Sequence, residues 1–99
     1  MHQTNIADAR RAPREEVNML VKVRISDHDV TVDGELDNIS RSGFLVWAKP
    51  SLDEGVHVVI VLDADLPGEE PIELSGVIVR TLERDDSRRP FGYGCEISV

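Results

Sequence analysis

Cysteine is almost missing from this chain, which has Cys95 alone among its 99 residues, so an intrachain disulfide is excluded and no oxidising compartment is required. Long apolar runs are missing too. The longest, Val58–Leu62, has the length of one strand and is far too short to span a membrane. The first nine residues are polar and do not resemble a secretion signal. We therefore expect a cytoplasmic protein without membrane insertion.

Positive charge is scarce, with 11 Lys and Arg against 19 Asp and Glu, and the net charge is −8. Proteins that bind long nucleic acids normally present a basic field, and single-strand binders also need stacking aromatics, of which this chain has four. We therefore expect no DNA or RNA partner. The charge is uneven, because residues 1–24 carry +2 and the other 75 residues carry −10. A basic arm on an acidic body suits one compact anion, although a solvated tail gives the same pattern.

Patterns for catalysis are also lacking. The three histidines, His2, His28 and His57, are far apart and show no metal-ligand spacing. A nucleophilic Ser40 would need a nearby base oriented by a third group, and no pattern supplies one. We expect neither an enzyme nor a bound cofactor.

What the chain does contain is apolar residues at every second position, which is typical of half-buried strands. This alternation and the turn signals between the runs predict six strands, at about 21–25, 30–36, 44–47, 56–62, 72–82 and 91–97. No convincing amphipathic helix is present, so the fold class is all-β. Closing a six-stranded antiparallel sheet into a β-barrel would remove its exposed edges. Residues 1–16 show neither the period of a strand nor that of a helix. They are interpreted as a flexible leader before a domain at 17–99.

A phase slip interrupts the second run. Val32 and Leu36 share one parity, whereas the next apolar residue, Ile39, has the other. Such a slip turns side chains to the opposite face unless a bulge absorbs it. We therefore predict a bulge near Asp37 and Asn38.

Two polar clusters could form a binding site. Arg10 and Arg14, four apart in the leader, carry guanidinium groups that bind phosphate oxygens or the O6/N7 edge of guanine. Asn38 and Ser40 would supply neutral donors and acceptors from a rigid side, and Gly43 would let the backbone turn without a Cβ in the way. Asn, Ser and Gly alone are weak evidence, because they also gather in ordinary turns.

Together the clusters Arg10-x-x-x-Arg14 and Asn38-x-Ser40-x-x-Gly43 resemble the PilZ domain, a bacterial receptor for the second messenger cyclic di-GMP. The resemblance extends to the closing stretch at 92–97. It implies a six-stranded antiparallel β-barrel of the split-barrel type. It also implies that the leader arginines close over the ligand and contact its phosphates and guanine.

Other residues near these motifs have open roles. Arg11 and Arg41 could add charge to the site, though the pattern does not require them, and Arg11 is equally well explained as a solvated neighbour. Glu15 and Glu16 directly follow Arg14 and could weaken anion binding. Many members of the family continue into a C-terminal helix, so a chain ending at Val99 would be a minimal form or a fragment.

Two functions follow from the resemblance. The first is a cyclic di-GMP receptor or adaptor, in which the bound ligand orders the leader and changes the surface presented to a partner protein. The alternative is a PilZ-like protein-interaction module that does not bind the nucleotide. We also expect Trp47 in the core or as a plug at the barrel end, with contact to a partner protein as the alternative, and Cys95 as a small buried hydrophobic residue.

Overall fold

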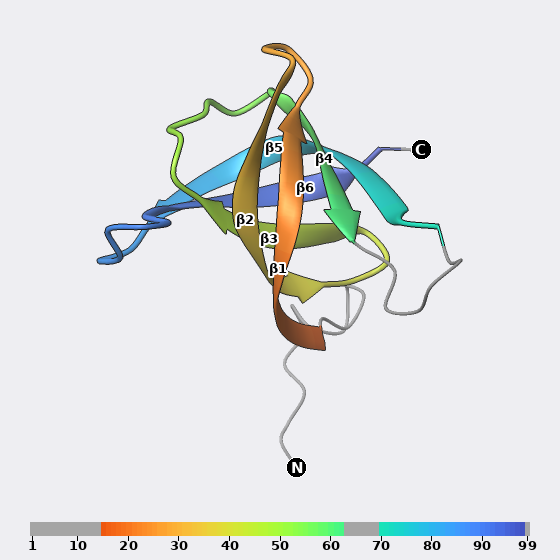
Figure 1. The fold of residues 1–99 in the computed structure, drawn as a ribbon, viewed down its shortest axis with the longest axis horizontal. Coiled ribbons are helices and arrows are strands. Elements are labelled where there is room, and N and C mark those ends of the chain that lie inside the picture. Colours follow the sequence, from red (N-terminus) through yellow and green to blue (C-terminus); the bar gives the residue numbers. More distant parts are fainter. Residues whose placement is uncertain (1–14, 63–69, 99) are drawn as a thin grey trace, which may run out of the picture.

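The computed structural model of this chain describes residues 15–62 and 70–98, and these residues form strands and connections without a helix. The all-β class predicted from the alternation is confirmed. The six strands are β1 (Glu15–Ile25), β2 (Val30–Ile39), β3 (Gly43–Ala48), β4 (His57–Leu62), β5 (Ile72–Glu83) and β6 (Phe91–Ile97) (Figure 1).

The strands close into a barrel in the order β1-β2-β3-β6-β5-β4, and every neighbouring pair is antiparallel. β1 and β2 cross β3, β5 and β6 at a steep angle (Figure 1). The barrel closes where residues 22–25 of β1 pair with residues 58–61 of β4. The predicted six-stranded antiparallel barrel is therefore confirmed. In the part of the chain that the structure describes, no helix could cross a membrane.

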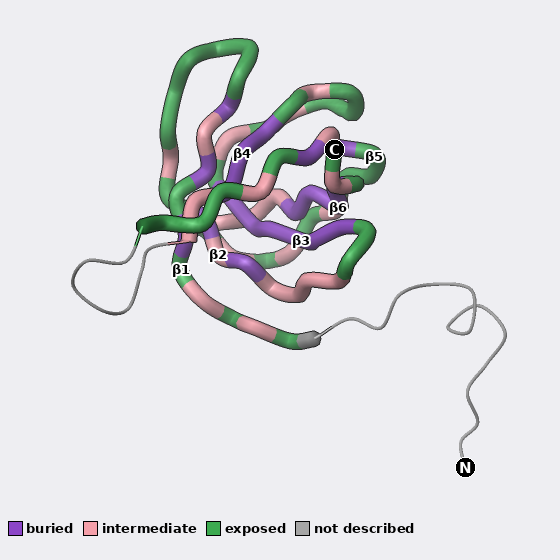
Figure 2. The backbone as a smooth tube through the Cα atoms, turned by 90° about the vertical axis from the view of Figure 1, so that its right-hand side faces the viewer, coloured by how far each residue is buried: buried purple, intermediate pink, exposed green. Residues whose placement is uncertain are grey.

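Alternate residues of every strand fill the barrel. β3 is buried along its whole length (Figure 2). Tyr93 is the largest fully buried side chain, and its hydroxyl donates to the Pro50 carbonyl and accepts the Leu52 N–H at 2.7 Å, which fixes the loop after β3. The contiguous buried cluster consists of Val21, Val23, Ile25, Leu36, Phe44, Val46, Ala48, Val58, Ile60, Ile78, Tyr93 and Cys95.

The first strand begins earlier than its alternation indicated. The register between β1 and β2 shifts between Glu16 and Met19, and Asn18 within this bulge has a φ of 52°. The extra residue breaks the period of two, so residues 15–20 do not look like a strand in the sequence. They nevertheless pair with the end of β2. Residues 1–14 of the expected leader lie outside the described residues.

Candidate ligand-binding site

The Asn38/Ser40/Gly43 motif occupies the end of β2 and the turn into β3. Leu36 pairs with Val46 and Asn38 pairs with Leu45, so Asp37 between them has no register partner on β3. The predicted bulge near Asp37 and Asn38 is confirmed.

This bulge decides which way Asn38 faces. Cross-strand partners in an antiparallel pair project from the same side of the sheet. Leu45 lies between the core residues Phe44 and Val46 on β3, so Leu45 and its partner Asn38 face outward. Without the extra residue, Asn38 would share the inward face of Leu36. The bulge thus places a polar side chain on the outer surface while Leu36 stays in the core.

The bulged residue Asp37 is itself held in place. Its Oδ2 accepts a hydrogen bond of 2.9 Å from Nε1 of Trp47, and its Oδ1 lies 3.5 Å from Nδ2 of Asn38. A charged acceptor makes the first bond strong, and the second is at the limit of a hydrogen bond. Asp37 therefore couples the orientation of Asn38 to that of the indole.

Ser40 shapes the turn between β2 and β3. Its N–H donates to the Gly43 carbonyl at 2.8 Å, and its Oγ accepts the Ser42 N–H at 3.3 Å. The longer hydroxyl contact is weak, which leaves the Ser40 side chain able to exchange it for a ligand atom. Arg41 is exposed at the tip of this turn and makes no ion pair or hydrogen bond with another described residue.

Gly43 is required for a different reason from the one that a turn suggests. Among the described glycines a positive φ occurs at Gly55 and not at Gly43. A Cβ on Gly43 would instead collide with the carbonyl oxygen of Cys95 on β6. The glycine therefore permits the close approach of β3 and β6 directly beside the turn.

The structure also shows where β1 starts relative to the motif. Glu15 pairs with Ile39, and Glu16 pairs with Asn38. Chain entry into the barrel is therefore adjacent to the Asn38 side of the motif. The predicted site residues Arg10, Arg11 and Arg14 lie outside the described residues. Of the predicted residues, the structure brings together Asn38, Ser40, Arg41 and Gly43.

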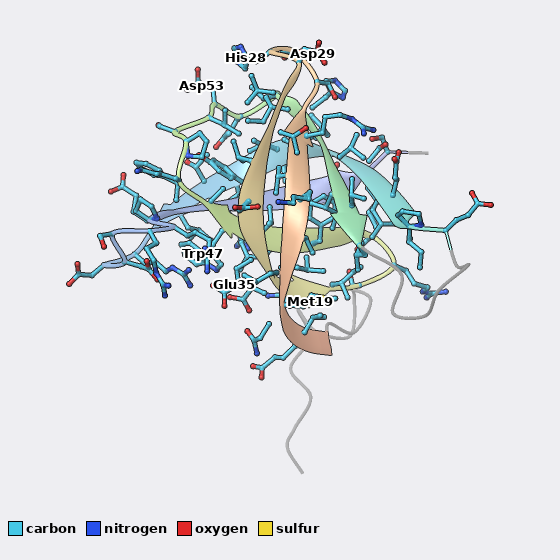
Figure 3. The ribbon with its side chains drawn as sticks, in the orientation of Figure 1. Met19, His28, Asp29, Glu35, Trp47 and Asp53 are labelled. Carbon is cyan, nitrogen blue, oxygen red and sulfur yellow. The ribbon has the colours of Figure 1, made fainter. Side chains whose placement is uncertain are left out.

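Trp47 is buried, but outside the barrel. It alternates with the core residues of β3, and its ring covers Gly92, where a Cβ would come within 2.8 Å of the indole. The Arg84 guanidinium lies 4.3 Å above the ring, and Figure 3 shows Trp47 and Glu35 on the same side of the molecule. Trp47 is thus buried, as expected of a core residue, and its ring lies between Gly92 and the Arg84 guanidinium on the outer face of β3.

Arg84 is fixed by several partners on two strands and a hairpin. Its Nη2 lies 2.8 Å from Oε1 of Glu35 and 3.5 Å from Asp86, and its Nε donates to the Arg89 carbonyl at 3.0 Å. The cation–π contact adds to these ion pairs. Sequence reasoning missed this arginine, because the charged stretch at 83–90 is typical of any exposed hairpin.

Comparison with known families decides the identity of the fold. The family model described as PilZ domain matches residues 8–99, a range that includes the leader arginines and the motif at the end of β2. The chain belongs to the PilZ domain family. No curated protein and no solved structure matches the chain significantly.

PilZ domains are binding and receptor modules and not enzymes, and the family is that of cyclic di-GMP receptors. Over residues 15–62 and 70–98, no group of three His, Cys, Asp or Glu side chains could hold a metal ion. Burial raises the pKa of the Cys95 thiol to about 12, so this cysteine is a structural residue of the PilZ barrel.

Proposed function

We propose that this PilZ domain is a cyclic di-GMP receptor in which Arg10 and Arg14 close over a ligand held against Asn38, Ser40 and the turn at Gly43. The observation that carries the proposal is the register of β1 on β2, where Glu16 pairs with Asn38 and Glu15 with Ile39. The leader is bonded to the strand that flanks the motif.

Chain geometry makes this closure possible. Arg14 is bonded to Glu15, so their Cα atoms are about 3.8 Å apart. Arg10 lies four residues further back, which gives it a reach of roughly 14 Å from Arg14 when extended. A cyclic dinucleotide at Asn38 is within range of both arginines.

The energy balance favours a charged ligand over a neutral one. Ordering leader residues costs about 1–2 kcal/mol per residue in backbone entropy. Hydrogen bonds to charged groups contribute about 1.5–3 kcal/mol each, and two guanidinium groups can make several of them. Ligand binding and leader ordering are therefore coupled. The ordered leader presents a new surface to a partner protein, which is the signal.

The alternative, a PilZ interaction module without nucleotide binding, has one observation in its favour. The exposed carboxylate of Glu16 belongs to the residue opposite Asn38, where it opposes the approach of an anion. The arginine pair and the motif occur together in the sequence, and this favours the receptor.

Calorimetric titration of the full chain with cyclic di-GMP tests the proposal. Arg14→Ala removes one or more charge-assisted bonds and is expected to weaken binding about 10-fold or more. Arg88→Ala removes the same charge from the exposed β5–β6 hairpin and should change affinity less than about twofold. Equal affinities of wild type and Arg14→Ala would contradict closure by the leader. A flat titration of folded wild type would favour the alternative.

Amide spectra with and without cyclic di-GMP test the coupling separately. We expect residues 10–16 and 38–43 to shift together during the titration. Shifts confined to residues 38–43 would mean that the ligand binds without ordering the leader.

A further inference from the structure

A row of paired residues runs across the outer surface of the barrel from Asn38 on β2 to Arg80 on β5. Asn38 on β2 pairs with Leu45 on β3, Leu45 pairs with Gly94 on β6, and Gly94 pairs with Arg80 on β5. Because cross-strand partners project from the same side, Asn38 and Arg80 face outward at the two ends of this row. The row covers three steps between neighbouring strands of about 4.8 Å each, so the path from Asn38 to Arg80 is roughly 14 Å when it is measured along the curved sheet.

Arg80 faces outward because β5 is bulged. The register between β5 and β6 shifts between Ile78 and Arg80, so Val79 has no partner on β6. Ile78 is buried in the core, and in a regular strand Arg80 would share its inward face. The bulges at Asp37 and at Val79 thus turn a polar side chain outward at each end of the same row. Bulges that re-aim side chains are over-represented next to binding and active sites.

The Arg80 side chain lies across β6 toward the motif. Its Nε and Nη2 are 3.1 and 3.5 Å from the position that a Cβ on Gly94 would occupy. The missing side chain of Gly94 therefore leaves the space in which the guanidinium lies. The Arg80 side chain therefore extends over Gly94, the residue of the row that lies between Arg80 and Leu45.

This guanidinium has no competing partner in the described part of the chain. Arg24 pairs with Glu73 and Arg84 pairs with Glu35, whereas the Arg80 guanidinium makes no ion pair or hydrogen bond with a described residue. Glu96, the carboxylate on the neighbouring row, pairs in register with Val77 and Gly43 and makes no ion pair with Arg80. The exposed guanidinium is a local positive charge that can pair with an anion, although the chain as a whole carries a net charge of −8.

We infer that Arg80 is a further ligand-binding residue and that it contacts a phosphate of the cyclic dinucleotide from the rigid barrel. The inference rests on the proposed function, since the ligand is the one held at Asn38. Arg80 would bind the ligand from the barrel, at the opposite end of the row from Asn38.

The test is calorimetric titration of the full chain with cyclic di-GMP for wild type, Arg80→Ala, Arg80→Lys and the control Arg88→Ala. We expect Arg80→Ala to weaken binding about 10-fold, and Arg88→Ala to leave affinity unchanged. An ammonium group supplies a point charge to phosphate, so Arg80→Lys should recover most of the loss. Because Arg80 is exposed, the thermal midpoints of all variants should agree with that of wild type.

The outcomes separate this inference from the proposed function. If folded wild type does not bind cyclic di-GMP, both the receptor function and the role of Arg80 are overturned. If wild type and Arg14→Ala differ but Arg80→Ala binds as tightly as Arg88→Ala, the receptor function stands and the role of Arg80 is overturned. If Arg80→Lys is as weak as Arg80→Ala, the assigned phosphate contact is overturned.

Discussion

Glu16 on β1 lies directly opposite Asn38 on β2, so an exposed carboxylate flanks the motif on the side where the chain enters the barrel. An acidic neighbour at an anion site weakens binding through Coulomb repulsion, by an amount that depends on solvent screening. We therefore expect this pairing to lower the affinity of the proposed site for an anion.

Neutralising this carboxylate should strengthen ligand binding. We expect Glu16→Gln to raise the affinity for cyclic di-GMP about two- to fivefold in low salt, because a repulsion of roughly 0.5–1 kcal/mol is removed. The gain should shrink at higher ionic strength as the charges are screened. Glu54→Gln, the same change in the exposed loop before β4, is the control and should have little effect. A gain of the same size in both variants would show that only the net charge matters.

Gly43→Ala should destabilise the fold. The new Cβ would meet the backbone carbonyl of Cys95, and a backbone atom cannot move away as easily as the end of a flexible side chain. We expect a loss of about 1–3 kcal/mol in the free energy of unfolding, measured by urea denaturation. Ser75→Ala, an exposed change on β5, should be close to neutral. An unchanged unfolding midpoint for Gly43→Ala would mean that β3 and β6 separate at little cost.

Asp37→Ala should loosen Trp47. The substitution leaves Nε1 of the buried indole without its acceptor, which costs about 1–3 kcal/mol. Trp47 is the single tryptophan of the chain, so its emission reports this change directly. Asp37→Asn keeps an oxygen acceptor and should be less harmful than Asp37→Ala. Wild-type emission and stability in both variants would show that the bond contributes nothing.

Alkaline pH should destabilise the barrel through Cys95. Burial raises the pKa of this thiol from 9.0 to about 12. Between these values the unfolded chain binds fewer protons than the folded chain, so the free energy of unfolding falls as pH rises. The slope reaches about 1.4 kcal/mol per pH unit at most. Burial also raises the pKa of Tyr93, which adds a loss of the same sign above about pH 10.

Urea denaturation between pH 8 and 10 measures this effect. Cys95→Ala should be less stable at pH 8 because it removes a buried group, but its stability should depend less on pH between 9 and 10. The thiol of folded wild type should also react slowly with a disulfide reagent at pH 8. Equal pH slopes for the two proteins would contradict the link to Cys95.

The strands could be predicted because apolar residues recur at every second position. The bulge at Asp37 could be predicted because this alternation shifts by one residue there. Val32, Leu36 and Ile39 were enough to place the slip at Asp37. The bulge at Val79 escaped prediction, because a valine fits either face of a strand and leaves no break in the pattern. For that reason the outward orientation of Arg80 could not be predicted from the sequence.

The motif residues could also be found from the sequence, whereas the side-chain contacts that position them could not. Asn38, Ser40 and Gly43 were recognised by their spacing. That Asp37 ties Asn38 to Trp47, and that Arg84 covers Trp47 from 37 residues further along the chain, depends on contacts between strands distant in sequence. Such contacts follow from the barrel topology and leave no local pattern.

The glycines under the outer face have a consequence for how this protein tolerates mutation. Surface positions of a barrel usually accept many residues, but a Cβ on Gly92 would meet the Trp47 ring at 2.8 Å, and one on Gly43 would meet the chain of β6. At Gly94 the atoms nearest to an added Cβ belong to the Arg80 side chain, the first of them at 3.1 Å, and the end of that side chain can move. In a scan of all substitutions, Gly43 and Gly92 should be as intolerant as the barrel interior. Substitutions at Gly94 should preserve the fold and reduce ligand binding.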